Sequence, residues 1–280
     1  MNKTLAIFEL MRLDKPIGIY LLLWPALLAL VISTNGDFEY SHLLIVIIGS
    51  ILVRSAGCVI NDIWDKDLDG DVERTKTRPI PSKKLSIFES WAVFGALGLF
   101  SLMLLSLTNT NTILISLCFG FMIVLYPLTK RFFIGPQIFL GLTFNPTIIV
   151  YAMTNELNNP TMIFLYLAVA AKTIAFDSFY GLCDIEDDKK LGINSTPLWW
   201  GSKTLLIIAI LQFAVISFLM VVGFKAELSS AWYIGIILLS GFYFYQHRLA
   251  LQKDFLLAFK NNHWASLYLL FLSVFCFLII

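Results

Sequence analysis

The sequence predicts an all-α integral membrane protein, a single domain over residues 1–280, with about nine transmembrane helices bundled around one cytoplasm-facing active-site cavity. Three observations predict this class. The chain is 58% hydrophobic and only 14% charged, unlike a soluble domain. Its apolar residues gather in runs of about twenty, the length that a helix needs to cross a bilayer. No run shows the alternating pattern of a membrane β-barrel, so backbone groups in lipid must pair within helices.

The apolar runs define the expected helices in chain order. They lie at 17–34, 43–62, 87–107, 112–129, 134–153, 162–183, 204–223, 230–247 and 264–280.

The distribution of Lys and Arg predicts the orientation of these helices. Of the 20 Lys and Arg residues, all but Arg54, Lys172 and Lys225 fall in the N-terminal segment and in alternate connections. The positive-inside rule places that group on the cytoplasmic side and the C-terminus on the opposite side. The formal net charge of +1 argues against nucleic acid as a partner.

Carboxylates appear abruptly where the second expected helix reaches the interface, in the stretch 61–69. Asn61, Asp65 and Asp69 are four residues apart, so they share a face if the helix continues. Oxygen ligands stacked in this way suit a hard divalent cation such as Mg²⁺, which keeps coordination positions for phosphate oxygens. The alternative is a solvated acidic loop.

A second acidic cluster follows the sixth expected helix. Asp184 and Asp188 are four residues apart, and Tyr180 and Asp177 lie one and two turns earlier. Both clusters fall on the expected cytoplasmic side, although the helices were drawn from hydropathy alone. The pair of clusters therefore predicts facing carboxylates over one cavity, which could bind several cations bridged by a diphosphate.

Basic segments follow both acidic clusters. The first contains Arg78 and the second Lys190, and cations beside a carboxylate–metal site suit a diphosphate leaving group. Ordinary cytoplasmic anchoring is the alternative, and it accounts for Lys83, Lys84 and Lys203. Arg78 and Lys190 are therefore the preferred candidates for diphosphate binding.

Arg54 lies inside an expected transmembrane helix, where a charge is costly and marks a functional candidate. It precedes Asn61 by seven residues and thus shares the face that carries Asn61 and Asp65, one to two turns deeper. A guanidinium in low dielectric needs an anionic partner. That partner is either a substrate or, as the alternative, a structural pair with Asp62 or Asp177.

These motifs resemble those of the UbiA family of intramembrane aromatic prenyltransferases, and the resemblance runs along almost the whole chain. The stretch 61–69 looks like the first Asp-rich motif of that family, and 184–188 is similar to the second. The signatures at 12–18, 21–25 and 126–131 look like those of bacterial members that prenylate 4-hydroxybenzoate.

The resemblance implies transfer of a polyprenyl group from polyprenyl diphosphate to 4-hydroxybenzoate, ortho to its hydroxyl group, in ubiquinone biosynthesis. It implies Mg²⁺ as the cofactor and a multi-pass protein of the bacterial inner membrane, with the N-terminus and active-site loops cytoplasmic and the C-terminus periplasmic. The alternatives are the same chemistry on another aromatic acceptor, or a secondary transporter that uses the buried acids. The transporter is disfavoured because the acids lie at one membrane face and no broken helix pair is expected at the midplane.

The resemblance, together with the residue chemistry, assigns roles to individual side chains. The catalytic carboxylates are Asp65, Asp69, Asp184 and Asp188, and Asn61 joins them as a metal ligand. Diphosphate binding falls to Arg78, Lys130, Arg131 and Lys190, and acceptor binding to Arg54, Asp177 and Tyr180. Asn194 stands where close relatives often have Lys, which removes one possible diphosphate contact.

Overall fold

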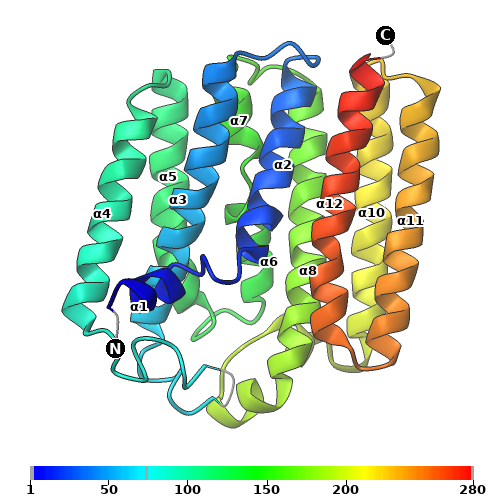
Figure 1. The fold of residues 1–280 in the computed structure, drawn as a ribbon. Helices are drawn as coiled ribbons and strands as arrows, with labels where there is room; N and C mark the ends of the chain where they lie inside the picture. Colours follow the sequence, from blue (N-terminus) through cyan, green and yellow to red (C-terminus); the bar gives the residue numbers. More distant parts are fainter. Residues whose placement is uncertain (1–2, 73–74, 279–280) are drawn as a thin grey trace.

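A computed structural model describes residues 3–72 and 75–278. Within these residues the chain forms helices and no strand, as the sequence predicts (Figure 1). The helices are α1 (Lys3–Leu10), α2 (Ile17–Ser33), α3 (Tyr40–Trp64), α4 (Ile87–Leu105), α5 (Thr110–Thr129), α6 (Pro136–Thr143), α7 (Thr147–Met153), α8 (Thr161–Leu191), α9 (Thr196–Trp200), a 3₁₀ turn η1 (Gly201–Lys203), α10 (Thr204–Lys225), α11 (Ser230–Leu251) and α12 (Phe255–Leu278).

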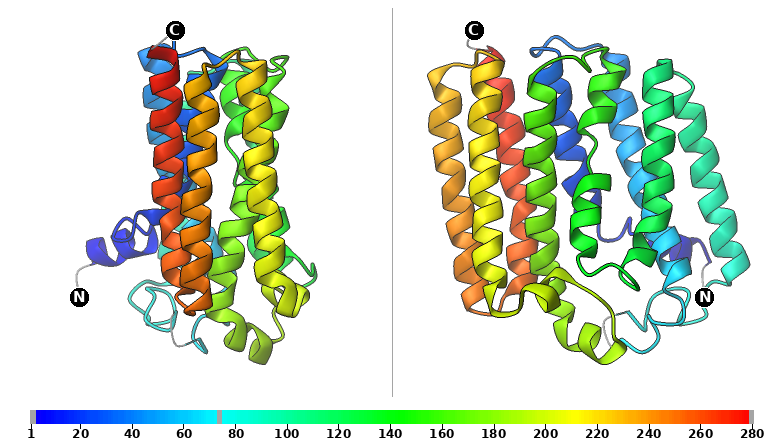
Figure 2. Two further views of the ribbon diagram at one scale, coloured as in Figure 1. Left: turned by 90° about the vertical axis from the view of Figure 1, so that its right-hand side faces the viewer. Right: turned by 180° about the vertical axis from the view of Figure 1, so that it is seen from behind.

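The long helices run side by side, and the two termini lie at opposite ends of the bundle (Figures 1 and 2). Among the described residues, 6 helical segments are long and apolar enough to cross a membrane, and the apolar helix α2 is somewhat shorter. We call the end of the bundle that carries residues 65–72, residues 75–86 and the C-terminus of α8 the acidic end. At this end α1 lies across the bundle axis, with Ala6 and Leu10 buried and Leu5 exposed.

Two helix boundaries differ from the sequence prediction in a way that shapes the acidic end. Helix α3 ends at Trp64, so Asp65 and Asp69 lie in a turn, and the condition under which they would share one helical face with Asn61, a continuing helix, is not met. The backbone N–H of Asp69 still donates to Asp65 O at 2.8 Å, which keeps the turn tight. Helix α8 instead runs through the second acidic cluster to Leu191 and is terminated by Gly192, whose φ of 65° suits glycine.

The predicted helix over 134–153 is wrong, because the chain breaks it into α6 and α7. Pro146 has no N–H to donate and its ring crowds the preceding turn. The side chain of Asn145 forms two hydrogen bonds at the break: Nδ2 donates to Tyr166 O at 2.9 Å, and Oδ1 accepts from Thr147 N at 3.2 Å. The break is therefore fastened to α8, which carries Tyr166.

The largest hydrophobic core lies between α2, α7, α8, α10, α11 and α12, around buried Trp232, Tyr151 and Leu165. In the other half of the bundle, α4 packs mainly against α3, and much of its surface faces outward. The loosely packed half, made of α3, α4 and α5, leaves an internal space beside the well-packed half.

Candidate active site

A cavity of about 1540 Å³ occupies the internal space beside α3, α4 and α5. Ten of the twelve residues assigned to the site from the sequence line it: Arg54, Asn61, Asp65, Asp69, Arg78, Lys130, Asp177, Tyr180, Asp184 and Asp188.

Arg131 and Lys190 are not among the lining residues. Arg131 instead donates to Trp64 O at 2.6 Å. Lys190 has a largely exposed side chain that pairs with Asp187 at 3.6 Å. Lys172, which lies deeper in the membrane, donates to Asn262 O at 3.4 Å and to the Ser266 hydroxyl, and thus joins α8 to α12.

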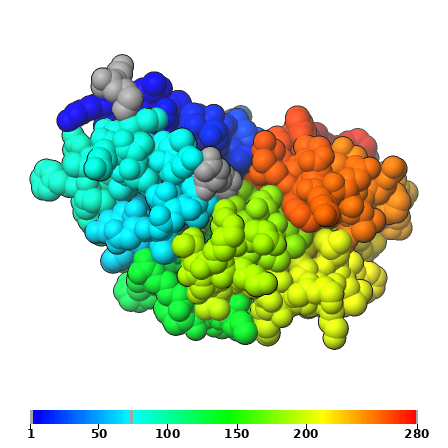
Figure 3. Space-filling view, turned by 90° about the horizontal axis from the view of Figure 1, so that it is seen from below, coloured from blue at the N-terminus to red at the C-terminus, as the bar shows by residue number. Residues whose placement is uncertain are grey.

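The two acidic segments come together at the acidic end. Seen from this end, the described residues 65–72 and 75–85 lie next to the segment around 184–195 (Figure 3). The backbone N–H of Asn194 donates to Lys130 O at 2.9 Å, which ties the second segment to the end of α5. The expectation of both clusters beside one cavity is met by this geometry.

Asp65 is the most enclosed of the candidate metal ligands, with 2% of its surface exposed. Its Oδ2 accepts hydrogen bonds from Lys130 and, at 3.2 Å, from Asn61 Nδ2. Its Oδ1 is buried and has no hydrogen-bond partner. Burial raises the pKa of the Asp65 carboxyl, and the positive charge of Lys130 opposes this rise. The carboxylate therefore has one oxygen ready to accept a cation or a donor.

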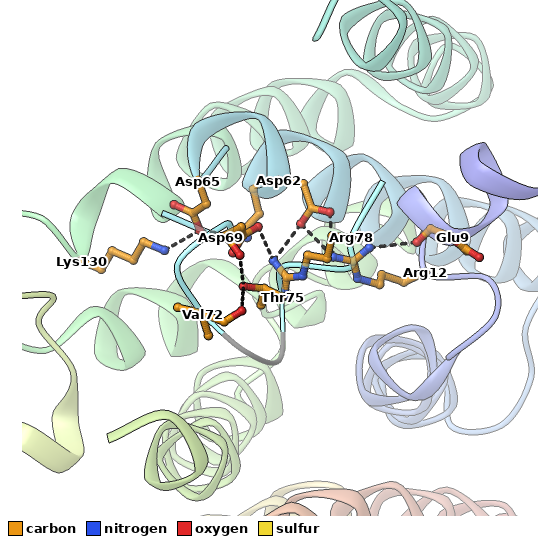
Figure 4. Close-up of polar contacts among 10 residues, drawn as sticks. Glu9, Arg12, Asp62, Asp65, Asp69, Val72, Thr75, Arg78 and Lys130 are labelled. Atoms are coloured by element: carbon orange, nitrogen blue, oxygen red, sulfur yellow. Dashed lines mark hydrogen bonds and ion pairs between the residues drawn. The ribbon is translucent and has the colours of Figure 1, made fainter. Parts of the chain in front are cut away.

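Asp69 and Asp62 belong to a chain of charges that also contains two arginines (Figure 4). Arg78 Nη1 donates to Asp69 Oδ2 at 2.8 Å and to Asp62 Oδ1 at 3.1 Å. Arg12 Nη2 lies 2.8 Å from each oxygen of Asp62. Because Asp62 is only 1% exposed, these two guanidinium groups supply the compensation that a buried carboxylate needs.

Arg12 is a site residue that the sequence does not single out. It lies among the basic residues of the N-terminal segment, in the stretch 12–18 that carries part of the family resemblance. In the structure Arg12 lines the cavity and links the segment before α2 to the end of α3.

Arg54 lines the cavity from α3, farther from the acidic end and closer to the middle of the bundle than Asn61 and Asp65. It packs so closely on Gly18 that a Cβ there would lie 2.3 Å from Arg54 Nε. Its guanidinium carbon lies 5.4 Å from the centre of the Phe144 ring, at the break between α6 and α7. The Nε atom is buried and has no hydrogen-bond partner. Arg54 is therefore held in place by apolar contacts and leaves polar atoms for a ligand.

The structural pairs considered for Arg54 are not formed. Asp62 binds Arg12 and Arg78 instead. Asp177 lies within electrostatic range of Arg54, but in the described part of the chain no ion pair joins the two. The break that contributes Phe144 also lines the cavity, as irregular backbone at membrane depth must. The structure thus breaks the expected helix over 134–153, whereas the sites of secondary transporters are typically formed by a pair of such broken helices.

No group of three or more His, Cys, Asp or Glu residues within the described ranges is arranged to hold a metal ion. Arg78 and Lys130 instead occupy oxygens of Asp69 and Asp65. The cavity thus combines carboxylates, cations and apolar walls, which suits an anionic head group that is joined to an apolar body.

The sequence pattern of the UbiA prenyltransferase family matches residues 22–275. The chain belongs to this family. It is similar to proteins named 4-hydroxybenzoate octaprenyltransferase from Alcanivorax borkumensis (41% identity over 92% of this chain and 90% of the relative) and Vibrio campbellii (39% identity over 95% of each chain). The sequence-based assignment to the UbiA family and to prenyl transfer is confirmed.

Solved UbiA structures share the fold. A UbiA homolog from Aeropyrum pernix K1 superposes with a TM-score of 0.80 at 21% identity, over 90% of this chain and 94% of the homolog. A UbiA homolog from Archaeoglobus fulgidus, solved bound to GPP and Mg²⁺, has a TM-score of 0.71 at 18% identity, over 95% of this chain and 99% of that one.

Proposed function

We propose that this UbiA-family protein transfers a polyprenyl group from polyprenyl diphosphate to 4-hydroxybenzoate and forms 3-polyprenyl-4-hydroxybenzoate for ubiquinone biosynthesis. The observation that carries the proposal is identity of about 40% with named 4-hydroxybenzoate octaprenyltransferases over at least nine tenths of the chain. The cavity supports it, because charged groups gather at one end and apolar walls make up the rest.

A divalent cation fits the residues at the acidic end. The buried, unpartnered Oδ1 of Asp65 is a hard oxygen ligand without a donor, and Mg²⁺ is bound through few carboxylates together with phosphate oxygens. The side chains that would hold it are Asn61, Asp65, Asp69, Asp184 and Asp188. The bound cation would neutralise the diphosphate and thereby improve it as a leaving group.

The cations of the site would hold the diphosphate. Arg78 and Lys130 already lie against the carboxylates and line the cavity, whereas Arg131 and Lys190 would have to move to reach it. When the allylic C–O bond breaks, its electron pair leaves with the diphosphate. The resulting allylic cation can be sheltered by the negative faces of the lining residues Tyr126, Phe144 and Phe176.

The acceptor would lie deeper, against Arg54. A planar guanidinium can bind the carboxylate of 4-hydroxybenzoate through two parallel hydrogen bonds and so orient the ring. Asp177 and Tyr180 line the same cavity. The new C–C bond forms ortho to the phenol hydroxyl, and the displaced ring proton leaves to a base. Exclusion of water protects the cation from conversion to an alcohol.

Purified protein in detergent is expected to convert octaprenyl diphosphate and 4-hydroxybenzoate into 3-octaprenyl-4-hydroxybenzoate, with equimolar release of diphosphate in the presence of Mg²⁺. Mass spectrometry of the lipid extract measures the product, and a panel of phenolic acceptors tests the choice of acceptor. Product from another phenol alone would favour the same chemistry on a different acceptor. Uptake of a solute into proteoliposomes without diphosphate release would favour a transporter.

The proposed membrane orientation predicts the result of reporter fusions. Fusions after Lys84, Lys130, Lys203 and Lys253 are expected to report the cytoplasm, and fusions after Asn35, Asn109, Asn158 and Ala226 the periplasm. The physical reason is that the first group lies in connections rich in Lys and Arg. Opposite signals from the connection after Asp69 and the one after Asp188 would contradict a single site.

A further inference from the structure

Helix α2 passes very close to Arg54 of α3 at a glycine. Gly18 is buried in the first turn of α2 and lines the cavity. A Cβ built at Gly18 would lie 2.3 Å from Arg54 Nε, 2.6 Å from Nη2 and 2.9 Å from Cζ. Real Cβ atoms essentially never come within 3.0 Å of such neighbours. Arg54 can therefore keep its position only because residue 18 has no side chain.

The order of these three distances shows which side of the guanidinium faces α2. The group is planar, with three nitrogens around Cζ. The distance to Cζ is longer than the distances to Nε and Nη2, so the built Cβ lies beyond the edge that joins these nitrogens and not over the flat face. The Nε–Nη2 edge of Arg54 is thus turned toward the backbone of α2 at Gly18, and Nη1 lies on the far side of the group.

This orientation limits how Arg54 can bind an anion. A guanidinium can donate two parallel N–H groups to a carboxylate from its Nε–Nη2 edge or from its Nη1–Nη2 end. Helix α2 covers the first of these, in agreement with an Nε that is buried and has no hydrogen-bond partner. The centre of the Phe144 ring, 5.4 Å from Cζ, limits the group further. The Nη1–Nη2 end is therefore the part that remains for a ligand in the cavity.

We propose that Gly18 is a positioning residue of the acceptor site. It leaves the room in which the Nε–Nη2 edge of Arg54 lies, so that the Nη1–Nη2 end is presented to the carboxylate of the acceptor. The inference rests on the proposed function and adds to it the residue that sets the direction of carboxylate binding. Glycine lowers the stability of a helix relative to alanine, and the close approach of Arg54 gives a physical reason for glycine at this position.

Gly18→Ala tests this role with a single added methyl group. The backbone at Gly18 is helical, without a positive φ, so alanine fits the backbone. The methyl group would have to displace the flexible guanidinium by about 1 Å to reach an ordinary contact distance of 3.4 Å. KM for 4-hydroxybenzoate is expected to rise about fivefold, and KM for octaprenyl diphosphate should change by less than about twofold. The thermal unfolding temperature should not fall, because alanine favours a helix more than glycine does.

Gly57→Ala is the matched control. Gly57 lies on α3, one turn from Arg54, and lines the same cavity. A Cβ at Gly57 would meet Ile123 Cγ2 at 3.6 Å, which is an ordinary contact. This variant therefore adds the same methyl group to the same cavity without displacing Arg54, and KM for 4-hydroxybenzoate should stay within about twofold. A rise equal to that in Gly18→Ala would mean that any added methyl group disturbs the acceptor, and would overturn the proposal.

The double variant Gly18→Ala/Arg54→Leu shows whether Gly18 acts through Arg54. Leucine is shorter and has no guanidinium to displace, so the added methyl group should change KM for 4-hydroxybenzoate by less than about twofold in this background. The same fivefold rise in both backgrounds would mean that Gly18 acts independently of Arg54. That result, or an unchanged KM in Gly18→Ala, would overturn this inference and leave the proposed function intact. If the unchanged protein forms no product from 4-hydroxybenzoate, the proposed function fails and the inference falls with it.

Discussion

Replacement of Asp65 or Asp184 by Ala is expected to lower turnover by roughly 10³-fold. Asp65 is buried, binds Lys130 and presents one oxygen without a partner. Its removal would take away a cation ligand and also leave the Lys130 charge uncompensated. Asp184 lines the same cavity from α8, so we expect its loss to weaken the diphosphate site from the other side. Asp69→Ala and Asp188→Ala should behave alike.

Steady-state assays at saturating substrates measure this effect, and the chain offers matched controls. Asp71 and Glu186 are acidic residues of the same two segments, but they are exposed and do not line the cavity. Asp71→Ala and Glu186→Ala are expected to retain most activity. A chelator should abolish turnover reversibly, with Mg²⁺ restoring it. Retention of most activity by the combined Asp65→Asn and Asp184→Asn variant would count against the two-cluster site.

Replacement of Arg54 by Leu is expected to raise KM for 4-hydroxybenzoate at least about tenfold, which corresponds to about 1.4 kcal/mol. Arg54 has a buried Nε without a partner and packs against Gly18 and Phe144. Because Asp62 is committed to Arg12 and Arg78, the acceptor carboxylate is the anion that would satisfy Arg54. KM for the donor should hardly change.

Acceptors without a carboxylate provide the control for this role. They lack the charge that Arg54 would bind, so Arg54→Leu should penalise them much less. Arg54→Lys is expected to give an intermediate KM, because an ammonium keeps the charge but cannot form two parallel bonds. Equal losses for charged and uncharged acceptors would mean that Arg54 has a structural role or binds the diphosphate.

The sequence by itself determined the class of the protein and the main features of the candidate site. The composition and the length of the apolar runs suffice to predict a bundle of membrane helices. A bilayer requires every crossing helix to be apolar and about twenty residues long. Spacing by four residues suffices to group Asp184 with Asp188, since both lie on the continuous helix α8. The same local periodicity placed Arg54 on the cavity side of α3.

Contacts between distant segments decided the rest. Pro25 and Pro127 lie inside α2 and α5, which continue through them, whereas the chain breaks at Pro146. The break at Pro146 differs from the other two sites in the hydrogen bonds of Asn145, above all the one to Tyr166 O on α8. A local sequence pattern does not reveal a hydrogen-bond partner on a distant helix. Likewise Arg78 and Lys190 follow similar acidic clusters, yet only Arg78 lines the cavity. Local periodicity fixes the face of a helix, but only the packing of the whole chain fixes what that face meets.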